Sequence, residues 1–216
     1  MPWELTGISV AGFAAVAIHG ILAFVGWRHR ESRCGPELTA LHVVVGLSAL
    51  TYAIQLGFDS VPVQIFWWKA TFAVSAFVPA LWLVFVVQYV TRAEWLNPRR
   101  AVLFAVEPAV MIVAIATNSL HSLVWTVPAG ATATPGTAVE LVFGPLYYAH
   151  LTVAYLAVVI GMGMILLVGI RWSLVYWKQV LVLLVAPLPA FLSNIMFMFG
   201  VSPVPTLDLT PFTFSF

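Results

Sequence analysis

Long apolar segments, separated by short polar or proline-containing ones, run through the whole chain. About 20 apolar residues are enough to cross the hydrocarbon core of a bilayer as one α-helix. Segments of this kind cover residues 5–27, 38–58, 64–90, 101–119, 146–170 and 180–200, and a seventh begins at Pro211. The pattern predicts an all-α membrane protein: one polytopic domain over residues 1–216, with six complete transmembrane helices and the start of a seventh.

The composition supports this prediction. Hydrophobic residues make up 62% of the chain and charged residues only 8%, whereas soluble domains contain about 25% charged residues. The expected surroundings are therefore a lipid bilayer. The formal net charge is +1, and no basic or acidic run is present, so we expect no nucleic-acid partner.

The basic residues alternate between connections. All but one of the Lys and Arg residues lie in the first, third and fifth connections, and the opposite connections contain only acidic charges. By the positive-inside rule, the N-terminus is extracellular and a seventh helix would end in the cytoplasm. Cys34 then lies in a cytoplasmic loop as a reduced thiol. The basic residues of these connections are Arg28, Arg30, Arg33, Arg92, Arg99, Arg100, Arg171 and Lys178.

Small residues and histidines share helix faces in the first two segments. The predicted stripes are Gly7, Ala11, Ala15 and His19 in the first, and His42, Gly46, Ala49, Ala53 and Gly57 in the second. Small stripes let transmembrane helices approach closely, so we expect these helices to pack together. His19 and His42 would then form a polar contact, a proton-linked pair or, less favoured by their depths, a haem-ligating pair.

Two further charges lie within predicted spans. Glu107 lies about 10 Å along the fourth segment from Arg100, at 1.5 Å per residue. It is either a structural group satisfied by water or by the nearby arginines, or a proton-linked group. Lys69, near the outer end of the third segment, is expected to extend toward Asp59 or Glu140.

Aromatic residues and a histidine gather near the outer boundary. They are either interfacial anchors or the wall of an outer pocket for a small ligand, covered by the long connection 120–145. The candidate sensing residues are Trp67, Trp68, His121, Trp125, Tyr147 and Tyr148. Since no His, Cys or carboxylate spacing fits a metal site, we expect no metal and no cofactor.

The sixth segment contains Pro187 and Pro189, which remove backbone donors and predict a kink at mid-membrane. Asn194 is one group that could satisfy the freed carbonyls. The kink is either static or a hinge for signalling. No catalytic motif occurs in the chain, so we expect no enzymatic activity and name no catalytic residue.

Several stretches, in this order, resemble the seven-helix sensory region at the N-terminus of archaeal and bacterial sensor histidine kinases. They are FVPALWLVFVVQYV (77–90), TNSLHSLVW (117–125), FGPLYYAHLTVAY (143–155), APLPAFLSNIMFMFG (186–200) and DLTPFTFSF (208–216). The resemblance covers essentially the whole chain, and the last stretch, with Asp208, Thr210 and Pro211, resembles the entry to the seventh helix most closely.

The resemblance implies a signal-input region in the plasma membrane of a prokaryote, detecting an unknown small ligand or membrane stimulus. It implies PAS and kinase domains in cis, a homodimeric full-length protein, and a seventh helix interrupted here. Asp208, Thr210 and Pro211 would cap that helix, and with Pro187, Pro189 and Asn194 they are the candidate hinge or relay. The alternatives are a small transporter and, less favoured, a haem-binding electron carrier.

Overall fold

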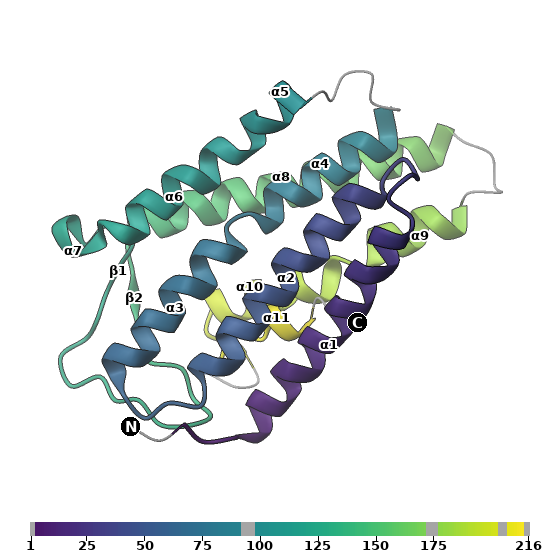
Figure 1. Ribbon diagram of the computed structural model, residues 1–216. Helices are drawn as coiled ribbons and strands as arrows, with labels where there is room; N and C mark the ends of the chain where they lie inside the picture. Colours follow the sequence, from purple (N-terminus) through teal and green to yellow (C-terminus); the bar gives the residue numbers. More distant parts are fainter. Residues whose placement is uncertain (1–2, 92–97, 172–176, 203–206, 214–216) are drawn as a thin grey trace.

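Helices make up most of the computed structural model, which describes residues 3–91, 98–171, 177–202 and 207–213 (Figure 1). The predicted loop residue Arg92 and the final residues, 214–216, lie outside this range. The helices are α1 (Gly7–Arg28), α2 (Gly35–Gln55), α3 (Val61–Ser75), α4 (Val78–Thr91), α5 (Pro98–Ala101), η1 (Val102–Ala105), α6 (Val106–Ala116), α7 (Asn118–His121), α8 (Pro145–Arg171), α9 (Trp177–Val185), α10 (Leu188–Met198) and α11 (Thr210–Thr213), and the strands are β1 (Trp125–Thr126) and β2 (Val142–Phe143).

Five helical segments of the described chain are long and apolar enough to cross a membrane. They are α1, α2, the segment Val61–Thr91 that contains α3 and α4, α8, and the segment Trp177–Met198 that contains α9 and α10. The chain is therefore a multi-pass membrane protein. The predicted total of six complete spans and a seventh stays a prediction.

The predicted fourth span, 101–119, differs from the expected single helix. It is divided into η1, α6 and α7. The continuous apolar part, Val102–Ala116, consists of η1 and α6 and is shorter than the five segments named above. Pro108 explains the change of winding, because it has no N–H to donate to the preceding turn and its ring crowds that turn. The backbone before it tightens into the 3₁₀ helix η1.

Prolines also interrupt two of the longer segments. The predicted kink in the sixth segment is present, since a turn at Ala186 and Pro187 separates α9 from α10. A second break, which the hydropathy pattern did not predict, lies at Ala76 and Phe77, directly before α4. Pro79, the second residue of α4, can begin a helix but cannot continue the one before it.

The first two helices pack closely, as predicted. In the predicted stripe of α1, Ala15 and His19 are buried as expected, but Gly7 and Ala11 are exposed. The buried positions of α1 are Ser9, Gly12, Ala15, His19, Ala23 and Gly26. They recur every three or four residues, which is one helix face. A Cβ atom on Gly12 would lie 2.6 Å from the Cβ of Ala53 on α2, so glycine is needed at this crossing.

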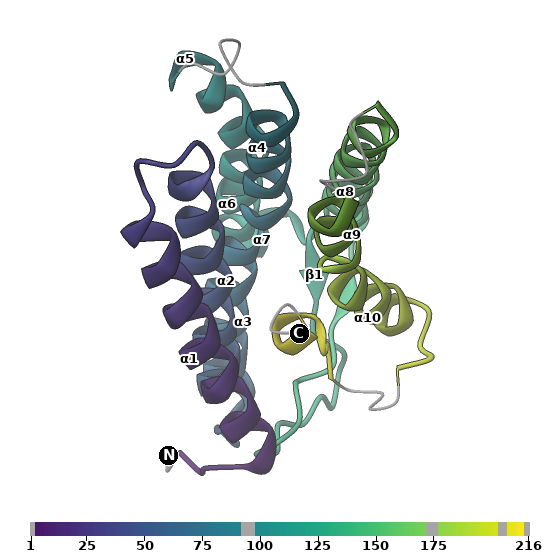
Figure 2. The same cartoon turned by 90° about the vertical axis from the view of Figure 1, so that its right-hand side faces the viewer.

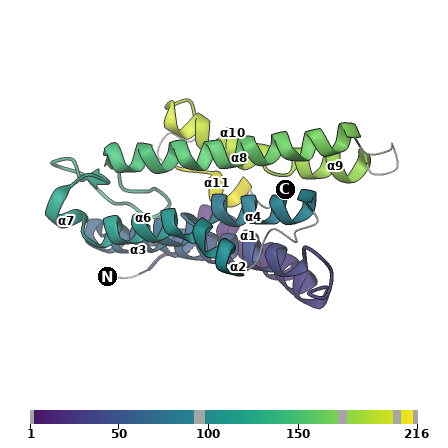
Figure 3. The same cartoon turned by 90° about the horizontal axis from the view of Figure 1, so that it is seen from above.

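The helices form two layers with α11 between them. Figure 3 shows α8, α9 and α10 on one side and α1, α2, α3, α4 and α6 on the other. Figure 2 shows that the α1–α2 connection, α5 and the ends of α4 and α8 lie at one end of the molecule. These elements carry every basic residue of the described chain except Lys69 on α3 and Lys178 on α9. Most of the described positive charge therefore lies at one end, as predicted.

Two side chains anchor the long outer connection. Asn118 donates from Nδ2 to the carbonyl of Trp125 at 2.9 Å, and its Oδ1 accepts from the N–H of Val124 at 2.9 Å. Gln64 on α3 donates to the carbonyl of Thr137 at 3.0 Å and accepts from Val139 at 2.8 Å. With the antiparallel pairing of β1 and β2, these bonds hold the predicted hairpin against the helices.

Candidate functional site

A cavity of about 640 Å³ lies between the two helical layers. Its walls are predominantly apolar and aromatic, and they come from α2, α3, α4, α8, α10 and the outer connection. The aromatic lining residues are Tyr52, Trp68, Phe72, Trp82, Phe85, Phe143, Tyr147, Tyr148, Tyr155, Phe191 and Phe197. A volume of this size lies within the usual range of small-molecule sites.

The charged groups of the cavity are carboxylates. Asp208, beside α11, and Glu140, in the outer connection, both line it, and none of the described lining residues is Lys or Arg. The polar lining also includes His42, His150 and Asn194. The described wall therefore has an excess of negative formal charge.

A chain of hydrogen bonds joins the cavity wall to α11. The Tyr155 hydroxyl on α8 donates to Oδ1 of Asn194 on α10 at 2.7 Å. Asn194 Nδ2 lies 3.5 Å from Oδ2 of Asp208. The Asp208 N–H donates to the Tyr52 hydroxyl on α2 at 3.1 Å. Asp208 thus joins α10 of one layer to α2 of the other, and α8 is linked to it through Asn194.

Asp208 in turn holds the start of α11. Its Oδ1 accepts from the Thr210 N–H at 2.9 Å and from the Thr210 hydroxyl. A side-chain oxygen that accepts from an N–H of the first turn is the usual way in which Asp begins a helix. This is the arrangement predicted for Asp208 and Thr210. Pro211, which is buried, follows inside α11.

Of the six candidate sensing residues predicted from the sequence, three line the cavity and three do not. Trp68, Tyr147 and Tyr148 line the cavity. Trp125 packs edge-on against Trp68, with 4.7 Å between ring centroids, behind the wall. Trp67 is not among the lining residues, and its ring meets Phe66.

His121 has a local role in the turn after α7. Its Nδ1 accepts from the Leu123 N–H at 3.0 Å, and its Nε2 lies 3.2 Å from the Thr117 hydroxyl. It does not line the cavity.

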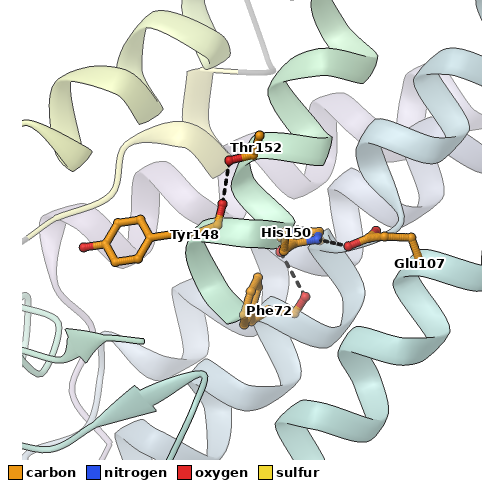
Figure 4. Close-up of polar contacts among 6 residues, drawn as sticks. Phe72, Glu107, Tyr148, His150 and Thr152 are labelled. Atoms are coloured by element: carbon orange, nitrogen blue, oxygen red, sulfur yellow. Dashed lines mark hydrogen bonds and ion pairs between the residues drawn. The ribbon is translucent and has the colours of Figure 1, made fainter. Parts of the chain in front are cut away.

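Glu107 has a different partner from the predicted ones. Figure 4 shows its carboxylate directed at His150 of α8, and Oε1 lies 2.6 Å from Nδ1. The side chain of His150 is 8% exposed and that of Glu107 is 35% exposed. The contact joins α6 to α8, and this histidine of another helix is a partner that the sequence did not indicate. Phe72 packs edge-on against the same imidazole, with 5.3 Å between ring centroids.

His19 and His42 meet between α1 and α2, with 3.0 Å between their Nδ1 atoms. Two imidazole nitrogens on opposite sides of one metal ion lie about 4 Å apart, because each metal–nitrogen bond is about 2.0 Å long. The direct contact between these nitrogens therefore differs from haem ligation and matches the interhelical polar contact.

Lys69 lies over the ring of Trp125, with 5.6 Å from Nζ to the ring centroid. Among the residues that the structure describes, no ion pair joins it to Asp59 or Glu140. The predicted acidic partners are replaced by a cation–π contact, which suits an ammonium beside an aromatic cluster at a membrane boundary.

Hydropathy and charge alone did not single out Tyr52 and Gln64. Both lie inside apolar segments, and the signal that could have drawn attention to them is a hydrogen-bonding side chain within a predicted span. Tyr155 was noticed only as part of the resemblance.

The family model for the N-terminal 7TM region of histidine kinase matches residues 12–216. No curated protein and no solved structure matches the chain.

Proposed function

The chain belongs to the family of N-terminal 7TM regions of histidine kinases, and we propose that it is the membrane signal-input region of a two-component sensor kinase. A stimulus that favours one arrangement of the helices moves α11, and α11 passes the movement to kinase domains. The kinase chemistry belongs to those domains, and this chain carries the sensing step.

The observation that supports this proposal most directly is the bonded path from the cavity to α11. Tyr155 and Asn194 line the cavity and lie on α8 and α10. Tyr155 donates to Asn194, and the Asn194 amide lies 3.5 Å from Asp208, which caps α11. The break at Pro187, directly before α10, gives this helix a point about which it can tilt. A change in the cavity therefore has a physical route to α11.

The proposal includes an orientation and partners. The N-terminus is extracellular and the basic end of the bundle faces the cytoplasm of a prokaryotic cell, following the positive-inside rule. The kinase domains follow α11 in the same polypeptide. The full-length protein is a homodimer, since the phosphoacceptor helices of such kinases pair.

The test of this proposal is the reading frame of the gene downstream of codon 216. We expect it to encode a dimerising phosphoacceptor helix pair with a histidine, followed by an ATP-binding domain. A frame that encodes neither of these, and no other output domain, would remove the basis for a signalling role.

A further inference from the structure

We propose that the cavity binds an amphipathic organic cation whose ammonium group lies against the carboxylate of Asp208. The proposal adds a ligand class to the input region proposed above. That such a ligand is the stimulus rests on the proposed function. The binding itself is a property of residues 1–216.

The first argument is the unequal use of the two Asp208 oxygens. Oδ1 accepts two hydrogen bonds from Thr210. Among the described residues, the one donor to Oδ2 is the amide of Asn194, at 3.5 Å, the outer limit of a hydrogen bond. Oδ2 can therefore accept a stronger donor from a ligand.

The second argument is the charge around Asp208. Among the residues described by the structure, no Lys or Arg nitrogen lies within 4.0 Å of its carboxylate, since the only ion pair found is that of His150 with Glu107. The donors to this carboxylate, from Thr210 and Asn194, are all uncharged, and a charge within a membrane bundle is costly when no opposite charge accompanies it. A ligand ammonium would supply the missing charge.

The third argument is the chemistry of the walls. Tyr147 stacks on Phe143 with 3.9 Å between ring centroids, and Trp68 and Phe197 lie beside the same pair. Aromatic faces attract cations and accept apolar groups. The absence of Lys and Arg from the described lining makes the cavity unfavourable for an anion, so a cation with an apolar body fits best.

The test uses three probes of one size and shape: 2-phenylethylammonium, 2-phenylethanol and phenylacetate. The purified 216-residue protein is reconstituted in nanodiscs of neutral lipid, and binding is measured by isothermal titration calorimetry at pH 7. Empty nanodiscs of the same lipid measure partitioning of each probe into the bilayer. We expect the ammonium to bind about tenfold or more tightly than the alcohol, because a charge-assisted hydrogen bond is stronger than a neutral one, and phenylacetate to bind most weakly.

Two variants locate the charge. Asp208→Asn removes the negative charge and keeps a side chain that caps helices well, so its Kd for the ammonium should rise to that for the alcohol. Asp59→Asn is the matched control, since Asp59 is exposed and does not line the cavity. It should bind all three probes as the unaltered protein does.

Equal affinity for the ammonium and the alcohol, or no binding of either, would overturn the proposal. So would an unchanged ammonium preference in Asp208→Asn, or its loss in Glu140→Gln alone. The three-probe comparison on the unaltered protein decides the charge preference even if Asp208→Asn fails to fold. Failure here leaves the kinase assignment intact, because the downstream reading frame tests that separately.

Discussion

Three pairs of polar side chains inside this bundle join different helices. His19 contacts His42, Glu107 contacts His150, and Tyr155 contacts Asn194. Without water in the hydrocarbon core, polar groups must find partners in the protein. These contacts therefore fix which helix faces meet.

The Glu107–His150 contact predicts strong coupling between the two positions. Glu107→Ala and His150→Ala should each destabilise the protein, and together they should cost less than the sum, with a coupling of about 0.5–3 kcal/mol. The reason is that removing either partner leaves the other polar group unpaired. Unfolding of the four proteins of this cycle in mixed micelles measures the coupling. An additive pair of effects would show that the contact contributes no specific energy.

The sequence predicted the contact between His19 and His42 but not the contact between Glu107 and His150, and the difference has a physical reason. The closeness of His19 and His42 followed from small-residue spacing, because a helix face is fixed by local geometry. Glu107 and His150 are separated by 43 positions and lie on two segments joined by the long connection 120–145. Their pairing depends on how whole segments pack, so depth along a single segment could not indicate it.

At the scale of helices, the α1–α2 crossing depends on Gly12. We predict that Gly12→Ala destabilises the protein by about 1–3 kcal/mol through overpacking against Ala53. Gly20→Ala on the same helix is the control, because a Cβ there has open space around it. Thermal unfolding of both variants in the same detergent measures the difference. Equal stability of the two would mean that α1 and α2 do not meet at Gly12.

The helical segments could be predicted more completely than their breaks. The interruption at Pro187 followed from its place in the middle of a long apolar run, and the turn there is present. The break before Pro79 and the winding before Pro108 were not predicted. Proline can begin a helix or interrupt one, and only the neighbouring packing decides which.

At the scale of the whole molecule, the single cysteine can be used to measure which side of the membrane the basic end of the bundle faces. Cys34 lies at the basic end, between α1 and α2. Burial raises the pKa of its thiol, and the Glu37 carboxylate raises it further. The thiolate is the reactive form, so labelling should be slow at pH 7 and faster as the pH increases.

This predicts the result of labelling with a membrane-impermeant maleimide at pH 8.5. Cys34 should react in inside-out vesicles and stay unlabelled in intact cells, because the orientation proposed above places the basic end in the cytoplasm. The matched control is Cys34→Ser with Ala129→Cys, which places the thiol on the exposed outer connection and should give the opposite pattern. Labelling of Cys34 from outside intact cells would reverse the proposed orientation.

The central claim is that Asn194 passes the state of the cavity to α11 and so to a kinase. The most direct measurement is the autophosphorylation rate of the full-length gene product in nanodiscs with radiolabelled ATP. Asn194→Ala removes the amide between Tyr155 and Asp208, and we predict that the rate changes by about fivefold or more. Thr132→Ala, on the exposed part of the outer connection, should leave the rate unchanged. An Asn194→Ala protein that is folded and phosphorylates itself at the unaltered rate would contradict the account.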